Sequence, residues 1–225
     1  MNIVSVPSDA TLLRSTHASI QFMDGQFYLL DSSESYHAAV RCGVGHAARE
    51  WPLSPTVCFS AGNSVFSVEE VDVSRPLLRV KVSEFVSEAN RLGRQRDGRR
   101  PECKPFRVEH SPFLTHLSLP PSPRDQVKTG PKRGTTININ NDGATIGRAN
   151  DNFVCIPDRE LSRRHSCVSF RDGGFYLSDL QSTNGTYVQL VGPYAGRYPL
   201  NLNDHILVGR TGFSINRFDY GLSEE

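Results

Sequence analysis

The sequence lacks the cysteine pattern of a metal site and that of a disulfide scaffold. It has five cysteines, an odd number, with no C-x-x-C pair and no histidine cluster at ligand spacing. We interpret them as reduced thiols, which are typical of cytosolic and nuclear proteins. We therefore expect an intracellular protein, nuclear or cytoplasmic, that uses neither a metal nor another cofactor.

Long apolar runs are also missing. No stretch approaches the roughly 18 apolar residues of a membrane-spanning helix, and the N-terminus lacks the basic start and apolar core of a signal peptide. The sequence contains no P-loop, nucleophile elbow or kinase loop set. These absences predict a protein without a membrane partner and without enzymatic activity.

A strong net charge is missing as well. The formal net charge of +1 argues against a dedicated nucleic-acid binder, because phosphate contacts need a basic face. The charge is uneven: residues 1–74 carry 3 basic and 8 acidic side chains, residues 75–111 carry 10 and 5, and residues 112–225 carry 12 and 11. We interpret the basic middle segment as a solvated connector and do not expect nucleic acid as a partner.

What the sequence does contain is a series of short apolar or alternating runs separated by turn residues. The predicted strands are 18–22, 26–30, 57–59, 65–68, 77–82, 113–119, 135–139, 144–146, 167–170, 175–178, 186–190, 205–208 and 213–216. Many short strands at this spacing are typical of an all-β sandwich or barrel. One helix is predicted over 83–93, because Ser83 can cap its start and Gly93 can end it.

Two segments of the chain resemble each other. Residues 17–31 and 165–179 share a His, a Phe, an Asp-Gly pair, a Phe-Tyr-Leu run and a final Asp at a constant offset of 148. Further along, residues 51–53 resemble residues 198–200. We interpret this as an internal repeat of a whole domain.

The repeat suggests a division of the chain into four parts. These are a first domain at 1–74, a connector with a strand and a short helix at 75–111, a second domain at 112–220 and a tail at 221–225. The first copy starts too late to hold every strand, so its sheet edges need a cover. We expect residues 75–90 to pack back on the first copy or to bridge the two domains.

The second copy holds three polar clusters that the first copy lacks. They lie at 147–148, 162–165 and 182–186, where strands are predicted to end or begin. Together they supply a guanidinium, hydroxyls, an amide and small turn residues, with no clear pair of nucleophile and base. This inventory suits the binding of an oxyanion.

The order and spacing of these clusters resemble a forkhead-associated (FHA) domain. The motifs that carry the resemblance are Gly147-Arg148, Ser162-x-x-His165, Thr183-Asn184-Gly185 and Gly209. FHA domains are β-sandwiches of two twisted sheets whose loops at one end bind phosphothreonine. The resemblance implies two FHA-like sandwiches of antiparallel or mixed sheets joined by the basic connector, of which the first is a degenerate copy.

The resemblance assigns five residues to the phosphothreonine: Arg148, Ser162, Arg163, Thr183 and Asn184. Arg148 offers a planar fork that suits the dianionic phosphate, and Ser162 offers a short hydroxyl donor. Thr183 is expected to donate to the phosphate or to line a slot for the threonine methyl group. Asn184 has both a donor and an acceptor, so it can clamp the peptide backbone.

Two nearby residues have alternative interpretations. Glu160 is expected to select the residue three positions after the phosphothreonine, favouring Arg or Lys, or else to be an exposed loop acid. His165 has the spacing of a catalytic partner for Ser162, but the family suggests a buried brace that hydrogen-bonds the loop backbone. The brace is favoured because the first copy, which lost the site, keeps this residue as His17.

Two glycines are expected to support the site. Gly185 is predicted to supply a positive-φ turn after Asn184. Gly147 is predicted to do the same before Arg148.

Taken together, these features predict a signalling adaptor or scaffold that binds phosphothreonine-containing proteins through its second domain. The alternative is a structural or assembly protein that uses both sandwiches for phosphate-independent docking or oligomerisation. Self-association through the first domain is open in either case.

Overall fold

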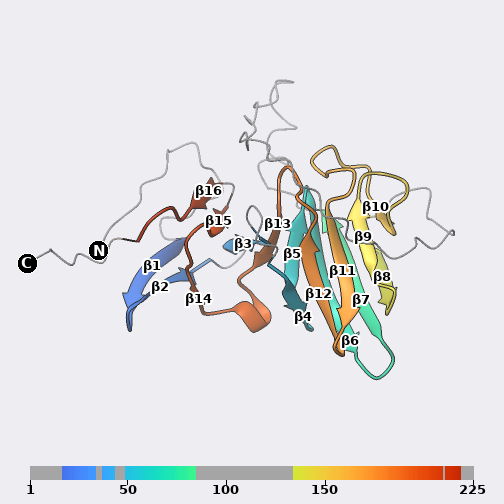
Figure 1. Ribbon diagram of the computed structural model, residues 1–225, viewed down its shortest axis with the longest axis horizontal. Coiled ribbons are helices and arrows are strands. Elements are labelled where there is room, and N and C mark those ends of the chain that lie inside the picture. The colour runs from blue at the N-terminus through green and yellow to red at the C-terminus, as the bar shows by residue number, and fades with distance from the viewer. Residues whose placement is uncertain (1–16, 34–36, 44–48, 85–133, 210, 219–225) are drawn as a thin grey trace, which may run out of the picture.

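The computed structural model describes residues 17–33, 37–43, 49–84, 134–209 and 211–218. The described residues form β-strands and one short 3-10 helix, η1 (Gly192–Tyr194), and contain no α-helix. The all-β class predicted from the sequence is therefore confirmed. Figure 1 shows the strands gathered into sheets that lie across one another.

Three sheets organise the described strands. The three-stranded sheet has the order β1 (Ala18–Met23), β2 (Gln26–Asp31), β14 (Arg197–Pro199). The five-stranded sheet has the order β10 (Val154–Cys155), β9 (Ala144–Gly147), β11 (Ser166–Arg171), β12 (Gly174–Asp179), β4 (Trp51–Leu53). The eight-stranded sheet has the order β16 (Thr211–Ser214), β15 (His205–Val208), β3 (Ala39–Arg41), β13 (Thr186–Gln189), β5 (Cys58–Ala61), β6 (Ser64–Asp72), β7 (Leu77–Glu84), β8 (Thr136–Asn140).

The predicted strands overlap observed strands wherever the structure describes them, and the one predicted over 113–119 lies outside the described residues. Four observed strands were not predicted: β3, β4, β10 and β14. Each has only two or three residues, too few for a periodic pattern to stand out.

The predicted helix over 83–93 lies mostly outside the described residues. Its first two positions, Ser83 and Glu84, belong to β7 and not to a helix. β7 pairs with β6 on one side and with β8 on the other, so it bridges the two parts of the chain. Residues 77–84 thus pair with a strand of the N-terminal part and with a strand of the C-terminal part, and the role expected for residues 75–90 stays a prediction.

Tight turns close two hairpins, one in each of the two segments that resemble each other. Asp172 and Gly173 have φ values of +49° and +74°, and Asp24 and Gly25 have φ values of +51° and +76°. Positive φ at both central residues is the backbone of a type I′ turn, which matches the twist of antiparallel strands. These turns fix the register of β11 with β12 and of β1 with β2.

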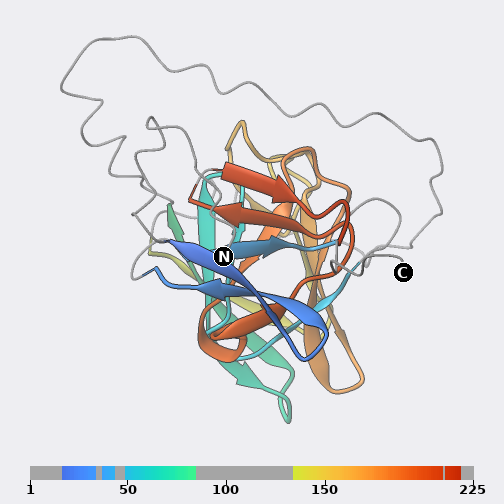
Figure 2. The same ribbon diagram turned by 90° about the vertical axis from the view of Figure 1, so that its left-hand side faces the viewer.

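Each of the three sheets combines strands from the N-terminal part of the chain, 17–84, with strands from the C-terminal part, 134–214. β4 extends the C-terminal five-stranded sheet by pairing with β12, and β14 extends the N-terminal hairpin by pairing with β2. β13 lies between β3 and β5. Figure 1 shows β13 (orange) between β3 (blue) and β5 (teal), and Figure 2 shows β3 and the red strands side by side.

The two sets of exchanged strands pair in matching register. Leu177 faces Trp51 across β12 and β4, and Leu29 faces Tyr198 across β2 and β14. Leu29 and Leu177 are equivalent positions in the two similar segments, as are Trp51 and Tyr198. In the structure, β4 of the N-terminal part thus pairs with β12 of the C-terminal part, and β14 of the C-terminal part pairs with β2 of the N-terminal part; below, these pairings are called the strand exchange.

The same correspondence holds in the large sheet. Val188 faces Phe59, and Val40 faces Ile206. In the first pair β13, which follows the β11–β12 hairpin, lies beside β5 of the N-terminal part. In the second pair β3, which follows the β1–β2 hairpin, lies beside β15 of the C-terminal part. Every sheet combines strands from both sides of the predicted boundaries at 74/75 and 111/112. These domain boundaries therefore stay predictions.

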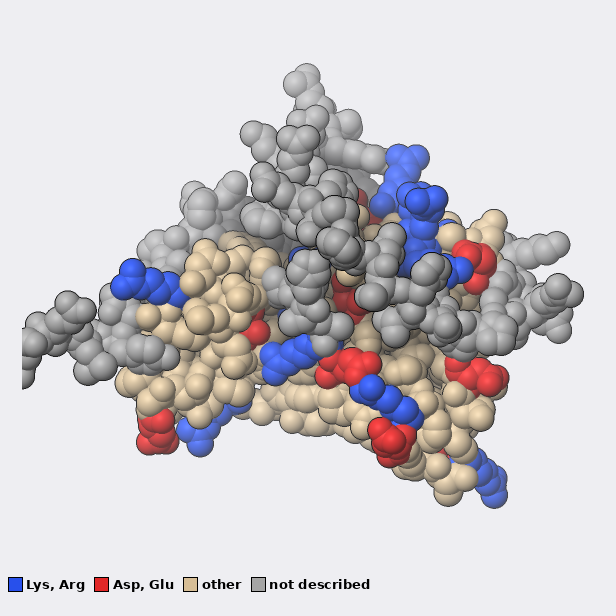
Figure 3. Space-filling view, viewed as in Figure 1, with Lys and Arg blue, Asp and Glu red and all other residues tan. Residues whose placement is uncertain are grey.

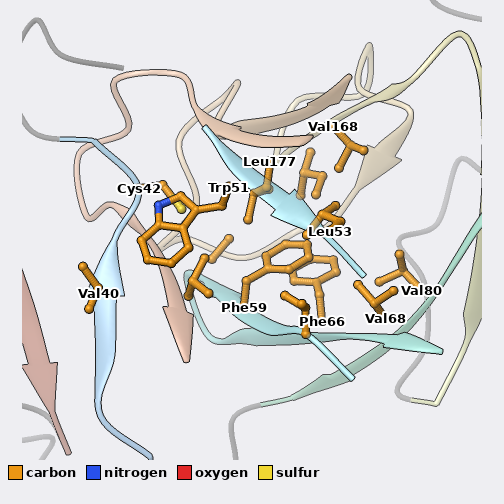
Figure 4. Packing of buried hydrophobic residues seen from close by; sticks show 14 of the residues in the cluster. Val40, Cys42, Trp51, Leu53, Phe59, Phe66, Val68, Val80, Val168 and Leu177 are labelled. Atoms are coloured by element: carbon orange, nitrogen blue, oxygen red, sulfur yellow. The ribbon is translucent and has the colours of Figure 1, made fainter. Parts of the chain in front are cut away.

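One part of the hydrophobic core lies between the five-stranded sheet and the β5–β7 part of the large sheet, and the cluster continues to Leu29, Val40, Tyr198 and Ile206. Phe59 and Phe66 stack with ring centroids 4.8 Å apart and both are fully buried. Figure 4 shows these rings beneath Leu53, Leu177 and Val168 of the opposite sheet. Because burial of one such side chain contributes about 1.5–3 kcal/mol, strands from both parts of the chain share in stabilising this core.

No helix in the described part of the chain is long and apolar enough to cross a membrane.

Candidate functional site

The three predicted clusters lie on connections at one end of the five-stranded sheet. Arg148 follows β9, Ser162 and Arg163 precede β11, and Thr183 and Asn184 lie between β12 and β13. Figure 1 shows these connections at the same upper end of the strands. Basic side chains gather on that side in Figure 3.

Ser162 joins the three clusters. Its carbonyl accepts a hydrogen bond from the Arg148 N–H (3.1 Å), and its Oγ accepts one from the Thr183 N–H (3.1 Å). Its Oγ also lies 3.5 Å from Thr183 Oγ1. The structure therefore brings Arg148, Ser162 and Thr183 together, although 35 residues separate the first from the last.

His165 links the connection before β11 to the connection between β12 and β13. It is fully buried; its Nδ1 accepts the Ser162 N–H (3.1 Å), and its Nε2 lies 3.0 Å from the Gly185 carbonyl. Nδ1 is thus an acceptor, and Nε2 carries the proton that it donates to Gly185. Burial lowers the pKa of His165, which keeps the ring neutral. Because Nδ1 is occupied by a backbone N–H, the ring is not placed to take the proton of the Ser162 hydroxyl.

Asn184 contacts Glu160 across the site. Its Nδ2 donates to the Glu160 carbonyl (2.9 Å) and to the Glu160 carboxylate (3.0 Å). Both residues are exposed, so the contact lies at the surface. The structure therefore places Glu160 beside the residue that was predicted to hold the peptide backbone.

Arg163 and Arg148 are exposed, and neither guanidinium has an ion pair with another described residue. Both are available to an anion. Their neighbour Arg164 differs, since it forms an exposed ion pair with Asp151 at 2.8 Å.

Gly147 does not have the positive φ that was predicted for it. It is required for another reason: a Cβ at this position would lie 2.3 Å from the Arg163 carbonyl and 2.9 Å from Asn152 Nδ2. Asn152 is buried and donates to that same carbonyl (2.7 Å). A close backbone approach, and not a turn, explains this glycine.

Gly185 has a φ of +85°, as predicted. Its N–H donates to Ser182 Oγ (3.0 Å), and a Cβ here would lie 2.5 Å from Arg41 Nε. Both the backbone conformation and the neighbouring Arg41 side chain exclude a larger residue.

A partly buried carboxylate supports the loop that holds Thr183 and Asn184. Asp179 accepts hydrogen bonds from Ser182 Oγ (2.6 Å), from the Ser182 N–H (3.0 Å) and from Thr186 Oγ1 (2.7 Å). The repeat offered a signal for this residue, since Asp31 stands at its equivalent position and accepts the Ala38 N–H in a similar way.

Three residues that contact the site loops were missed by sequence reasoning: Arg41, Asn63 and Asp158. Arg41 Nη2 donates to the Ser182 carbonyl (3.0 Å), and Asp158 accepts hydrogen bonds from Asn63. These contacts join positions 141 and 95 residues apart, so no local pattern could reveal them.

In the described part of the chain, no group of three or more His, Cys, Asp or Glu side chains is arranged to hold a metal ion.

Comparison with known families identifies the fold around this site. Residues 144–209 match the FHA domain. This FHA domain contains all three clusters, and FHA domains are non-catalytic modules that bind phosphothreonine-containing proteins. The rest of the chain has no such assignment.

Three curated relatives share this FHA region. The FHA domain-containing protein FhaB of Mycolicibacterium smegmatis is 42% identical over 62 residues, which cover 28% of this chain and 40% of that protein. The oxoglutarate dehydrogenase inhibitor of Corynebacterium diphtheriae is 37% identical over 62 residues, covering 28% and 43%. The glycogen accumulation regulator GarA of M. smegmatis is 36% identical over 62 residues, covering 28% and 39%. The chain thus spans about two fifths of each of these relatives.

Proposed function

We propose that this protein is a signalling adaptor that binds phosphothreonine-containing partners at the loop end of its FHA domain. The observation that carries the proposal is the junction at Ser162, whose backbone and hydroxyl hold the Arg148 and Thr183 segments together. A phosphate bound beside this junction would have the Arg148 side chain and the hydroxyls of Ser162 and Thr183 as its neighbours.

The five residues are proposed to bind the phosphate or the peptide backbone according to their chemistry. Arg148 and Arg163 neutralise a phosphothreonine dianion, and the Arg fork can bind two phosphate oxygens at once. Ser162 and Thr183 donate hydroxyl protons. Asn184 holds the peptide backbone, for which its amide has both a donor and an acceptor.

Arg148→Ala tests this function directly. We expect at least a tenfold loss of affinity for phosphothreonine peptides, because a charge-assisted contact to a dianion is lost. Arg164→Ala is the matched control, since Arg164 is exposed nearby but already paired with Asp151. The measurement is fluorescence anisotropy with phosphothreonine, phosphoserine and unphosphorylated forms of one peptide. Equal binding of all three peptides by the wild type would exclude the proposed function.

Glu160 is proposed to select the residue three positions after the phosphothreonine. Its carboxylate is exposed beside Asn184, where a peptide that Asn184 holds would pass. A degenerate phosphothreonine library should show enrichment of Arg and Lys at that position with the wild type and loss of this enrichment with Glu160→Gln. If neither protein enriches basic residues there, Glu160 is only a loop acid.

We also propose that the N-terminal part is a degenerate FHA-like copy. The matching register of the pairs Leu177–Trp51 and Leu29–Tyr198 supports this, as does the shared His17 and His165. The residues at 34–38 do not reproduce the Thr-Asn-Gly cluster, so this copy would contribute structure and not a phosphothreonine site.

A structural or assembly role remains the second candidate. Ile20 and Phe22 on β1 are about half exposed, which favours self-association through the N-terminal part. Concentration-dependent oligomerisation combined with absent phosphopeptide binding would favour this role over the first. The bacterial source of the relatives favours the cytoplasm over the nucleus as the site of either function.

A further inference from the structure

We propose that Arg41 and Asn63, which lie outside the matched FHA region, are positioning residues of the phosphothreonine site. The inference rests on the proposed function and extends it, because it makes binding depend on the N-terminal part of the chain. Each residue holds one of the two loops that carry the phosphate-binding groups.

Asn63 holds the loop that leads to Ser162. Its N–H donates to Asp158 Oδ2 (2.7 Å), and its Nδ2 donates to Asp158 Oδ1 (3.0 Å). Asp158 in turn accepts the Glu160 N–H at Oδ1 (3.0 Å), and its carbonyl accepts the Leu161 N–H (3.2 Å). The Asn63 side chain therefore fixes the carboxylate that shapes the turn just before Ser162.

The β5–β6 turn that contains Asn63 also lies very close to the loop before Ser162. Gly62 connects β5 to β6 with a φ of +57°, and a Cβ here would lie 2.6 Å from Asp158 Oδ2 and 3.0 Å from Leu161 Cγ. Leu161 is buried. The close approach of Gly62 and the hydrogen bonds of Asn63 thus act on the same loop.

Arg41 holds the second loop. β3 pairs with β13 so that Arg41 faces Tyr187. From there its Nη2 donates to the Ser182 carbonyl (3.0 Å), and its Nε lies where a Cβ on Gly185 would come within 2.5 Å. Ser182 and Gly185 flank Thr183 and Asn184 on either side, so Arg41 holds one end of the loop by a hydrogen bond and lies against the other end.

The strand exchange explains why these two residues come from the N-terminal part. β13 takes β3 and β5 as neighbours, and the FHA region's own β15 pairs with β3 instead. The turn beside the Asp158 loop is therefore the one between β5 and β6, not the one after β15. The FHA region thus contains the residues proposed to bind phosphate and, in His165 and Asp179, part of the support of their loops, while Asn63 and Arg41 add support from outside it.

The experiment uses the full chain and a labelled phosphothreonine peptide chosen from the library. We expect Asn63→Ala and Arg41→Ala each to weaken binding about tenfold, as loss of a hydrogen bond to or from a charged group does. The matched controls are Asn138→Ala on β8 and Arg75→Ala before β7, both exposed and away from the loops. The controls should bind within about twofold of the wild type, since surface changes of this kind leave contacts intact.

A double-mutant cycle separates positioning from a loss of stability. Asn63→Ala should cause no further weakening in the Asp158→Ala background, because the carboxylate through which it acts is gone. Arg41→Ala should weaken peptide binding less in the Thr183→Ala background than in the wild type, because the Thr183 side chain that Arg41 helps to position is gone. Thermal melts should show that every variant is fully folded at the temperature of the binding assay.

The outcomes distinguish this inference from the function on which it rests. If Arg148→Ala weakens binding but Asn63→Ala and Arg41→Ala bind like their controls, the positioning roles are wrong and the function stands. Additive effects in both double mutants would also exclude positioning. If the wild type does not discriminate phosphothreonine, both proposals fail.

Discussion

At the scale of single residues, the site is built by short polar side chains that join backbone segments. His165 shows this clearly, since both ring nitrogens bind the backbone of separate loops. Its position and its buried state could be anticipated from the Ser-x-x-His spacing and from His17 in the similar segment. The role of Gly147 could not, because the crowding by the Arg163 carbonyl depends on a loop that follows it in the sequence.

The buried imidazole predicts a pH dependence of stability. Burial lowers the folded-state pKa of His165, with the Asp179 charge opposing and the Arg41 charge adding to this shift. The unfolded state, with a His pKa of about 6.5, binds the proton more tightly. The stability due to neutral His165 is therefore fully present above about pH 6.5 and is lost as the pH falls below it.

Denaturant melts between pH 7.5 and pH 5.5 check this expectation. The wild type should lose stability over this range, and His165→Asn should be less stable at pH 7.5 by about 2–4 kcal/mol but flatter with pH. Both proteins should carry His205→Gln, because burial also lowers the pKa of His205. A wild-type slope equal to that of His165→Asn would contradict the buried neutral ring.

At the scale of elements, the hairpins follow from local sequence but their partners do not. β1–β2 and β11–β12 form where apolar and polar residues alternate around an Asp-Gly turn, and such a signal is contained within 14 residues. The choice of partner for β13 is different. Val188 faces Phe59, although the equivalent Ile206 has a similar apolar side chain and the same local pattern. Two strands that fit equally well cannot be distinguished by pattern alone.

At the scale of the whole molecule, the exchange makes the FHA region dependent on the rest of the chain. The core beneath β11 and β12 includes Phe59 and Phe66 from β5 and β6. A fragment of residues 134–225 keeps every residue that we propose to bind phosphate but lacks these strands. We expect it to unfold without cooperativity and to bind the phosphothreonine peptide at least tenfold more weakly, since large apolar surfaces lose their cover.

Circular dichroism melts and anisotropy on this fragment measure both expectations. The full chain is the reference, and addition of a separate fragment of residues 17–84 should restore binding in part. A fragment of 134–225 that binds as tightly as the full chain would show that β14, β15 and β16 can take the places of β4, β5 and β6.

The exchanged strands also set an order of events during protein synthesis. During synthesis, the ribosome releases β3, β4 and β5 long before β12 and β13. In the structure β4 pairs with β12, which lies about 124 residues further along the chain. Contacts this distant in sequence slow folding and leave strand edges open in the meantime. A nascent chain can therefore complete its five-stranded sheet only after β12 (Gly174–Asp179) has emerged and its eight-stranded sheet only after β16 (Thr211–Ser214) has emerged. The candidate site therefore cannot be assembled from the N-terminal part or the C-terminal part alone as each leaves the ribosome.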